Sequence, residues 1–321
     1  MPSRRGPYRL DLRRVDLAEE RGGLPWSLLD AIEAEGGLWF GGDWYTDPAD
    51  IVAQATASGA VALRLDCRDL AFLEELPSIR YLHLRTEGRP PLEPIASLRG
   101  LRALILEVGS LRGKIDLASF PDLRWLRINL GGKGGQAMLP TMAAGHPSVE
   151  WLAVAESRSS AVADVAAPFP GLRSFAIRNA DRIRRLGALA EAAPALRMLD
   201  VEVVGLRSLE GLEGVPGLEA LSVWSSPVRD IGPIGTLQSL GGLLLWTPAL
   251  PSIEPLRGLP HLRFLDVIVD GEPDRSVLDS LPSLAAIARR PGITTPLPWP
   301  DLGALDPADP LRREWARLRL G

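Results

Sequence analysis

One nine-residue pattern returns ten times along most of this 321-residue chain. Clear copies are LPSIRYLHL at 76–84, FPDLRWLRI at 120–128 and LPHLRFLDV at 259–267. Its anchoring apolar residues are 22 residues apart in six of the nine intervals, and they are Leu82, Leu104, Leu126, Leu152, Phe175, Leu199, Leu221, Leu243, Leu265 and Ile287. A period of this length, sustained over most of a chain, is the signature of a solenoid whose units bury apolar surface against their neighbours.

The pattern resembles the leucine-rich repeat superfamily in its short, 22-residue bacterial and phosphatase-regulator-like form, over roughly residues 60 to 290. The resemblance implies an α/β solenoid, a leucine-rich repeat horseshoe of about 10–11 repeats with a parallel concave sheet and short 3₁₀ or helical turns on the convex side. The residues agree, because Val228, Ile231, Ile234 and Leu237 recur every third position, which suits a 3₁₀ turn better than an α-helix.

The chain departs from the family at the turn position that usually holds an asparagine. Other residues stand there, namely Glu87, Gly109, Gly131, Ser157, Ala180, Val204, Ser226, Pro248 and Asp270. Backbone groups in these turns must therefore bond to water or to neighbouring carbonyls. A less regular solenoid than the family norm is expected.

Three regions follow from the extent of the repeat. Residues 1–59 are expected to form an N-terminal arm and helical cap, 60–290 the leucine-rich repeat solenoid, and 291–321 a C-terminal cap helix. Residues 24–34 read as an amphipathic helix, and a second helix begins after Asp47 with Pro48 in its first turn and ends at Gly59. Residues 37–42 and 60–66 look like atypical first strands, and the last helix begins after Asp309.

Alternation along the expected strands decides which side chains face outward. The anchor and the residue two places later point into the core, so the residues before, between and after them point out from the concave sheet. These positions form three columns that run from strand to strand. The side chains expected to bind a partner there are Tyr81, His83, Arg85, Trp125, Arg127, Trp151, Arg178, Asp200, Glu202, Trp224, Leu244, Trp246, Phe264 and Asp266.

Two pairs of tryptophans occupy these columns on neighbouring strands: Trp125 with Trp151, and Trp224 with Trp246. Strand spacing places the members of a pair roughly 5 Å apart. With Leu244 beside it, the second pair is expected to form an apolar patch on the order of several hundred Å², which monomeric proteins seldom leave bare. Three readings stay open: binding of another protein or peptide, self-association, or cover by the arm or tail of the same chain.

Charges divide the same face. Its arginines lie toward the N-terminal half and its carboxylates toward the C-terminal half. Arginines also recur two places before the anchor, as Arg80, Arg102, Arg124, Arg173, Arg197 and Arg263. Such an edge can engage phosphates, but arginine is common at this place in these repeats, where its stem packs and its charged head stays in water.

Residues that carry chemistry are sparse. The nearest acid–base combination is His83 with Glu107 and Arg127 on adjacent strands, with no nucleophile or metal cluster beside it. A solvated charged face explains this combination better than an active site does. No catalytic residue, metal site or cofactor is therefore predicted.

Composition narrows the class of protein. The net charge of −4 gives no overall attraction for nucleic acids or anionic membranes, and the single cysteine, Cys67, excludes an internal disulfide. Arg64 and Arg68 beside Cys67 can lower its pKa, although an inert thiol is the default. Two lysines against 34 arginines suggest a GC-rich bacterial source, and the polar N-terminal stretch suggests a cytoplasmic protein.

These features predict a non-enzymatic protein- or peptide-binding scaffold with an adaptor, inhibitor or immunity-type role. An enzyme or accessory enzyme of a biosynthetic system, with acid–base residues on the concave face, is the alternative. RNA binding along the arginine edge is a second alternative. The expected partner is a protein or peptide, with self-association left open and with neither a membrane nor a nucleic acid expected.

Overall fold

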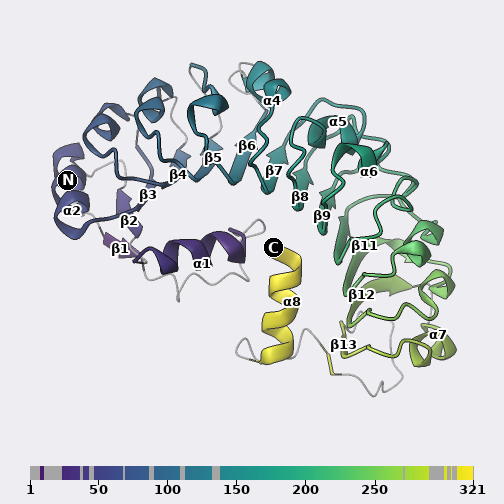
Figure 1. The fold of residues 1–321 in the computed structure, drawn as a ribbon. Coiled ribbons are helices and arrows are strands. Elements are labelled where there is room, and N and C mark those ends of the chain that lie inside the picture. The colour runs from purple at the N-terminus through teal and green to yellow at the C-terminus, as the bar shows by residue number, and fades with distance from the viewer. Residues whose placement is uncertain are drawn as a thin grey trace, which may run out of the picture. The chain divides into compact units, whose positions relative to one another are not determined.

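The computed structural model describes residues 8–10, 24–36, 39–42, 47–67, 69–86, 90–108, 113–131, 138–269, 272–288, 300–301, 305 and 309–320. The chain divides into two compact units, Met1–Ala155 and Glu156–Gly321. Each unit carries consecutive strands joined by short helical turns (Figure 1).

In Met1–Ala155, the sheet follows the order of the sequence. Strand β1 (Tyr8–Leu10) runs antiparallel to β2 (Trp39–Gly42), and each later strand is parallel to the one before it. The later strands are β3 (Ala62–Leu65), β4 (Tyr81–Thr86), β5 (Ala103–Val108), β6 (Trp125–Asn129) and β7 (Trp151–Ala155). The helical segments are α1 (Trp26–Ala34), α2 (Pro48–Ser58), η2 (Ala71–Glu75), η3 (Glu93–Ser97), η4 (Leu117–Ser119) and α4 (Leu139–Ala144).

In Glu156–Gly321, six strands again pair in parallel and in sequence order. They are β8 (Ser174–Arg178), β9 (Met198–Glu202), β10 (Ala220–Trp224), β11 (Gly242–Leu250), β12 (Phe264–Val269) and β13 (Ala286–Ile287). The helical segments are α5 (Val162–Ala166), α6 (Leu189–Ala192), η6 (Gly232–Thr236), η7 (Glu254–Leu256), α7 (Arg275–Asp279) and α8 (Pro310–Leu320).

Strand register confirms the predicted fold class. The anchors Leu82, Leu104, Leu126 and Leu152 stand opposite one another in the first unit, and the anchors from Phe175 to Ile287 do so in the second. All ten anchors are buried. Together with the 3₁₀ turns between strands, this register makes each unit a leucine-rich repeat solenoid with a parallel sheet.

Backbone groups in the turns find substitutes for the missing asparagines. Ser226 stands at one of those positions and donates its hydroxyl to the carbonyl oxygens of Val203, at 2.6 Å, and Trp224, at 3.1 Å. Ser225 takes a positive φ of 54° directly after β10, and its N–H donates to the carbonyl of Trp246. Neighbouring carbonyls therefore do accept the bonds that this turn needs.

Helix ends follow the predicted caps. The Asp47 carboxylate accepts from the N–H of Ala49, and Gly59 ends α2 in the left-handed conformation at φ 64°. The Asp309 carboxylate accepts from the N–H of Leu311 at the start of α8, at 2.8 Å. Among the helices that the structure describes, none is long and apolar enough to cross a membrane.

Candidate functional site: the concave faces

We call the outward side chains of β4–β7 the N-terminal concave face and those of β8–β13 the C-terminal concave face. The predicted columns are present, since Trp125 stands opposite Trp151 and Trp224 opposite Trp246. The ring centroids of Trp224 and Trp246 lie 4.4 Å apart and their planes are inclined by 53°. Strand alternation therefore predicted correctly which side chains leave the sheet on this face.

Helix α1 covers much of the N-terminal concave face. It lies on the side of the strands opposite the helical turns (Figure 1), and its Leu28 and Ile32 are fully buried. The Tyr81 hydroxyl donates to the Glu35 carboxylate just after α1, at 2.8 Å, and the Trp125 indole donates to the Ser27 hydroxyl, at 3.1 Å. Tyr81 is consequently buried and Trp125 only 8% exposed.

Glu35 also ties α1 to the arginine edge of the first unit. Arg80 donates to one of its carboxylate oxygens at 2.8 Å, and Arg102 donates to the other. Burial, followed by the hydrogen bond to Glu35, raises the pKa of Tyr81, so its hydroxyl stays protonated and continues to donate. One carboxylate thus holds three side chains of the solenoid.

The combination of His83, Glu107 and Arg127 is assembled as predicted, with His83 buried and its two partners partly exposed. His83 Nε2 lies 3.1 Å from Glu107 Oε2, and Arg127 donates to the other oxygen of Glu107. Burial lowers the pKa of His83, which is only 3% exposed. Burial alone would raise the pKa of Glu107, but the hydrogen bond and charge of His83 and the charge of Arg127 hold it at about 2. Arg127 also stacks over the ring of Trp151, 5.5 Å from its centroid.

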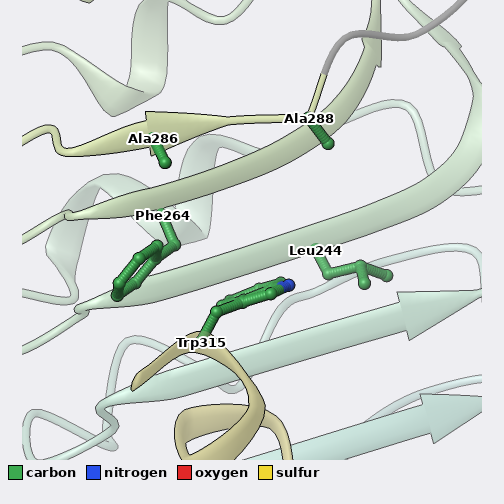
Figure 2. Packing of buried hydrophobic residues seen from close by; sticks show 5 residues of the cluster. All are labelled: Leu244, Phe264, Ala286, Ala288 and Trp315. Atoms are coloured by element: carbon green, nitrogen blue, oxygen red, sulfur yellow. The ribbon is translucent and has the colours of Figure 1, made fainter. Parts of the chain in front are cut away.

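Helix α8 covers the C-terminal concave face, where it lies against β9, β10 and β11. Figure 2 shows Trp315 of α8 lying against the strands that carry Leu244 and Phe264, with Ala286 and Ala288 beyond them. The ring centroids of Trp315 and Phe264 are 5.6 Å apart. All five residues are buried, and Trp224 and Trp246 pack against this cluster while remaining partly exposed.

Charged side chains flank that cluster. Arg178 donates to Asp200 at 2.7 Å, and its Nε lies 3.9 Å from Glu202. The Trp246 indole donates to Asp266 at 3.2 Å. The carboxylates thus hold both an arginine and an aromatic ring in place.

The chain's own helices cover most of the side chains that were predicted to face outward. Tyr81, Leu244 and Phe264 are buried because α1 or α8 lies over them, and Trp125, Trp151, His83, Asp200 and Asp266 are each less than 9% exposed. Arg85 is exposed, and the residues that keep intermediate exposure are Arg127, Arg178, Glu202, Trp224 and Trp246. Partner binding, self-association and cover by the same chain were the three possibilities for these side chains, and the structure shows cover by α1 and α8.

Four residues of these faces were missed from the sequence: Ser27, Glu35, Gly242 and Trp315. Three of them belong to or flank helices that periodicity cannot place on a particular strand. Gly242 carried a usable signal, because it is the only glycine in a column otherwise filled by side chains.

Most of the arginine edge is engaged in ion pairs. Arg80 and Arg102 bind Glu35, Arg124 lies 3.8 Å from Glu150, Arg197 binds Glu219 and Arg263 binds Glu314. Each pair offsets positive charge that a phosphate backbone would otherwise meet.

Cys67 does not have the activated thiol that its neighbouring arginines suggested. Burial, and then the charges of Asp66 and Asp69, raise its pKa to about 12. Within the described residues, no group of three His, Cys, Asp or Glu side chains is placed to hold a metal ion.

No protein-family model matches the sequence, and no curated protein matches it. Similar solved structures include an internalin, InlF, from Listeria monocytogenes, with a TM-score of 0.49 and 20% identity over 67% of this chain and 68% of that one. They also include TLR13 in complex with ssRNA13, with a TM-score of 0.46 and 13% identity over 75% of this chain and 48% of that one. A third is the Drosophila Toll–Spatzle complex, with a TM-score of 0.35 and 12% identity over 75% of this chain and 31% of that one.

The chain spans about half of TLR13 and about a third of the Toll chain. All three TM-scores lie below 0.5, so the fold is assigned from the 22-residue repeat and the strand register of the chain itself. By those two properties, the protein has the leucine-rich repeat fold.

Proposed function

We propose that this protein is a non-enzymatic scaffold that binds another protein or a peptide through its C-terminal concave face. The observation that carries the proposal is the pair formed by Trp224 and Trp246, whose inclined rings lie in contact on adjacent strands and stay partly exposed beside α8. Closely spaced aromatic side chains with a charged rim are the usual anchors of protein interfaces. Arg178 and Glu202 supply such a rim here.

The chemistry of the described residues favours binding over catalysis. His83 is buried, its partner Glu107 is engaged by Arg127 in an ion pair, and the Cys67 thiol is held protonated. A general base must reach its substrate, and a nucleophilic cysteine must be a thiolate. The paired arginines of the edge likewise favour a protein over RNA.

An adaptor, inhibitor or immunity-type role fits a scaffold that presents a single binding face. We propose that it acts in the bacterial cytoplasm, because the arginine-rich, lysine-poor composition suggests a GC-rich bacterial source and a single cysteine suits a reducing compartment. Self-association through the same face is an alternative that the experiments below separate.

The proposal is tested by selecting peptides from a displayed library on the immobilised full-length protein. Enriched peptides are then titrated against Trp224→Ala/Trp246→Ala and against Val204→Ser, which changes an apolar side chain that is 63% exposed on a loop of the same unit. Loss of two anchors at about 2 kcal/mol each corresponds to roughly a 1,000-fold loss of affinity, whereas Val204→Ser should leave binding unchanged.

Far-UV circular dichroism and the melting temperature establish that both variants are folded. Failure to enrich any peptide on the wild type, or equal affinity for the folded double variant, would overturn the proposal.

A further inference from the structure

Gly242 opens a notch in the C-terminal concave face. It occupies the column in which β8, β9, β10 and β12 carry Ser174, Met198, Ala220 and Phe264. The Trp315 ring fills the space that a side chain would take, because a Cβ on Gly242 would lie 2.6 Å from Cζ3 of Trp315 and 3.3 Å from its Cε3. Glycine is thus required at this strand position for an indole to approach the backbone.

The helix that fills the notch presents one apolar face to it. Leu311, Trp315 and Leu318 follow a spacing of four and then three residues, so they lie on the same side of α8. Leu311 and Leu318 pack against the cluster around Trp315, and a methyl group of Leu318 would lie 3.7 Å from a Cβ on Gly242. A tryptophan in a notch between two leucines is the arrangement by which grooves hold amphipathic helices.

Charge matches as well as shape. Residues 310–320 contain four arginines and one glutamate, whereas the outward positions of β8–β12 carry Asp200, Glu202 and Asp266 against a single arginine, Arg178. The face therefore attracts a basic helix. Glu314, the one acid of α8, stands three residues after Leu311 and four before Leu318, so it flanks the apolar side of the helix. It binds Arg263 at the edge of the sheet, with Nε to Oε1 at 2.8 Å.

In the part of α8 whose side chains the structure describes, Trp315 is the main anchor to the sheet. Among the described side chains of α8, Trp315 alone is buried, and the Arg263–Glu314 pair is more than 40% exposed on both sides. An exposed ion pair adds little, and an 11-residue helix is marginal by itself in water. Such an occupant can exchange with a competing helix of the same chemistry.

We propose that the Gly242 notch and the apolar strip around it form a receptor for a tryptophan-anchored, arginine-rich amphipathic helix of a partner protein, which displaces α8. This inference rests on the proposed binding function and names the chemistry of its partner. The anchor is a tryptophan with leucines four places before and three places after it, and the basic residues suit a face whose outward carboxylates outnumber its one arginine.

The test uses the full-length protein and a fluorescein-labelled peptide of residues 309–321, followed by fluorescence anisotropy. In Trp315→Ala, the notch is vacated and the peptide should bind at least tenfold more tightly than to the wild type, whose own α8 competes. Adding Gly242→Ala to that host should weaken binding roughly 5- to 150-fold, because the new Cβ would intrude on the indole site. Adding Gly217→Ala instead is the matched control, since a Cβ there meets nothing nearer than 3.9 Å.

Two peptide variants test the stated chemistry. A peptide with alanine in place of its tryptophan should not bind, and one with glutamine in place of its four arginines should bind at least tenfold more weakly. Equal binding of the glutamine peptide would overturn the basic character of the partner. If the unaltered 309–321 peptide does not bind to a folded Trp315→Ala host, the proposal that the notch receives a helix is overturned.

Two further results separate this inference from the alternatives. A dimer of the wild type in light scattering, lost in Trp315→Ala, would show that a second copy supplies the helix and would overturn the choice of partner. If the helix peptide fails while library peptides still depend on Trp224 and Trp246, the binding function stands and the helix receptor falls.

Discussion

Replacing Gly242 by alanine should loosen α8 without disturbing the sheet beneath it. The added Cβ would sit 2.6 Å from Cζ3 of Trp315, where carbon atoms in contact need about 3.5–4.0 Å, so the ring must retreat by about 1 Å. Overpacking of this kind costs about 1–3 kcal/mol. Complete expulsion of the indole would cost more, since burial of a tryptophan is worth roughly 4–6 kcal/mol as an upper estimate.

Hydrogen exchange followed by mass spectrometry measures this effect on the peptide 309–321 of the intact protein. A loss of about 1–3 kcal/mol in docking corresponds to roughly 5- to 150-fold faster exchange in α8, with exchange in β10 and β11 unchanged. Gly217→Ala should exchange like the wild type. Unaltered protection of α8 in Gly242→Ala would refute the reasoning, because the ring would then not occupy the notch.

Further predictions concern the N-terminal concave face and the cysteine. Glu35→Gln should lower the free energy of unfolding by about 1–3 kcal/mol in urea titrations, because the bonds of Tyr81 and two arginines to that carboxylate weaken; an unchanged midpoint would contradict that role. In the folded protein the pKa of His83 is lowered and that of Glu107 is about 2, so the unfolded chain takes up protons at a higher pH than the folded one. The free energy of unfolding should therefore fall as the pH drops below about 6.5, where His83 of the unfolded chain is protonated, and again below about 4.5, where Glu107 is. His83→Gln should flatten the first decline in urea midpoints, and a slope identical to that of the wild type would count against it. With its pKa near 12, Cys67 should react with a disulfide reagent at pH 8 at least about 100-fold more slowly than a model thiol, and rapid labelling of the folded protein would refute the burial argument.

The repeat and its register were predictable because they depend on local periodicity. The 22-residue spacing places each anchor opposite the next, and a fold of this kind satisfies that pairing in only one way. Helix boundaries at Asp47 and Asp309 were predictable for the same reason, since a cap and a proline act within one turn.

The position of α1 and α8 could not be read from the sequence. The direction in which a side chain leaves the sheet is set by its own strand. Whether that side chain is buried depends on which other part of the chain packs over it. Phe264 and Tyr81 face outward as alternation requires, and both are buried by helices that lie far away in sequence. Strand β1 was missed because three residues in a charged stretch carry no usable period.

Gly242 was the one sequence feature that indicated the packing of α8 on the sheet. A column of side chains interrupted at Gly242 indicates that something else fills the gap. The sequence alone did not say that Trp315 fills it, because no pattern links a helix at the end of the chain to a strand about 70 residues earlier.

The most direct test of the account is a nuclear Overhauser effect between the Trp315 ring and the Gly242 Hα protons in the full-length protein, labelled selectively at tryptophan and glycine. The structure predicts a strong cross-peak from the ring edge that carries Cζ3 and Cε3, lost in Trp315→Ala. Chemical shifts of the Trp315 ring protons typical of a solvent-exposed indole, with no cross-peak to Gly242, would contradict the claim that this face holds a tryptophan-anchored helix.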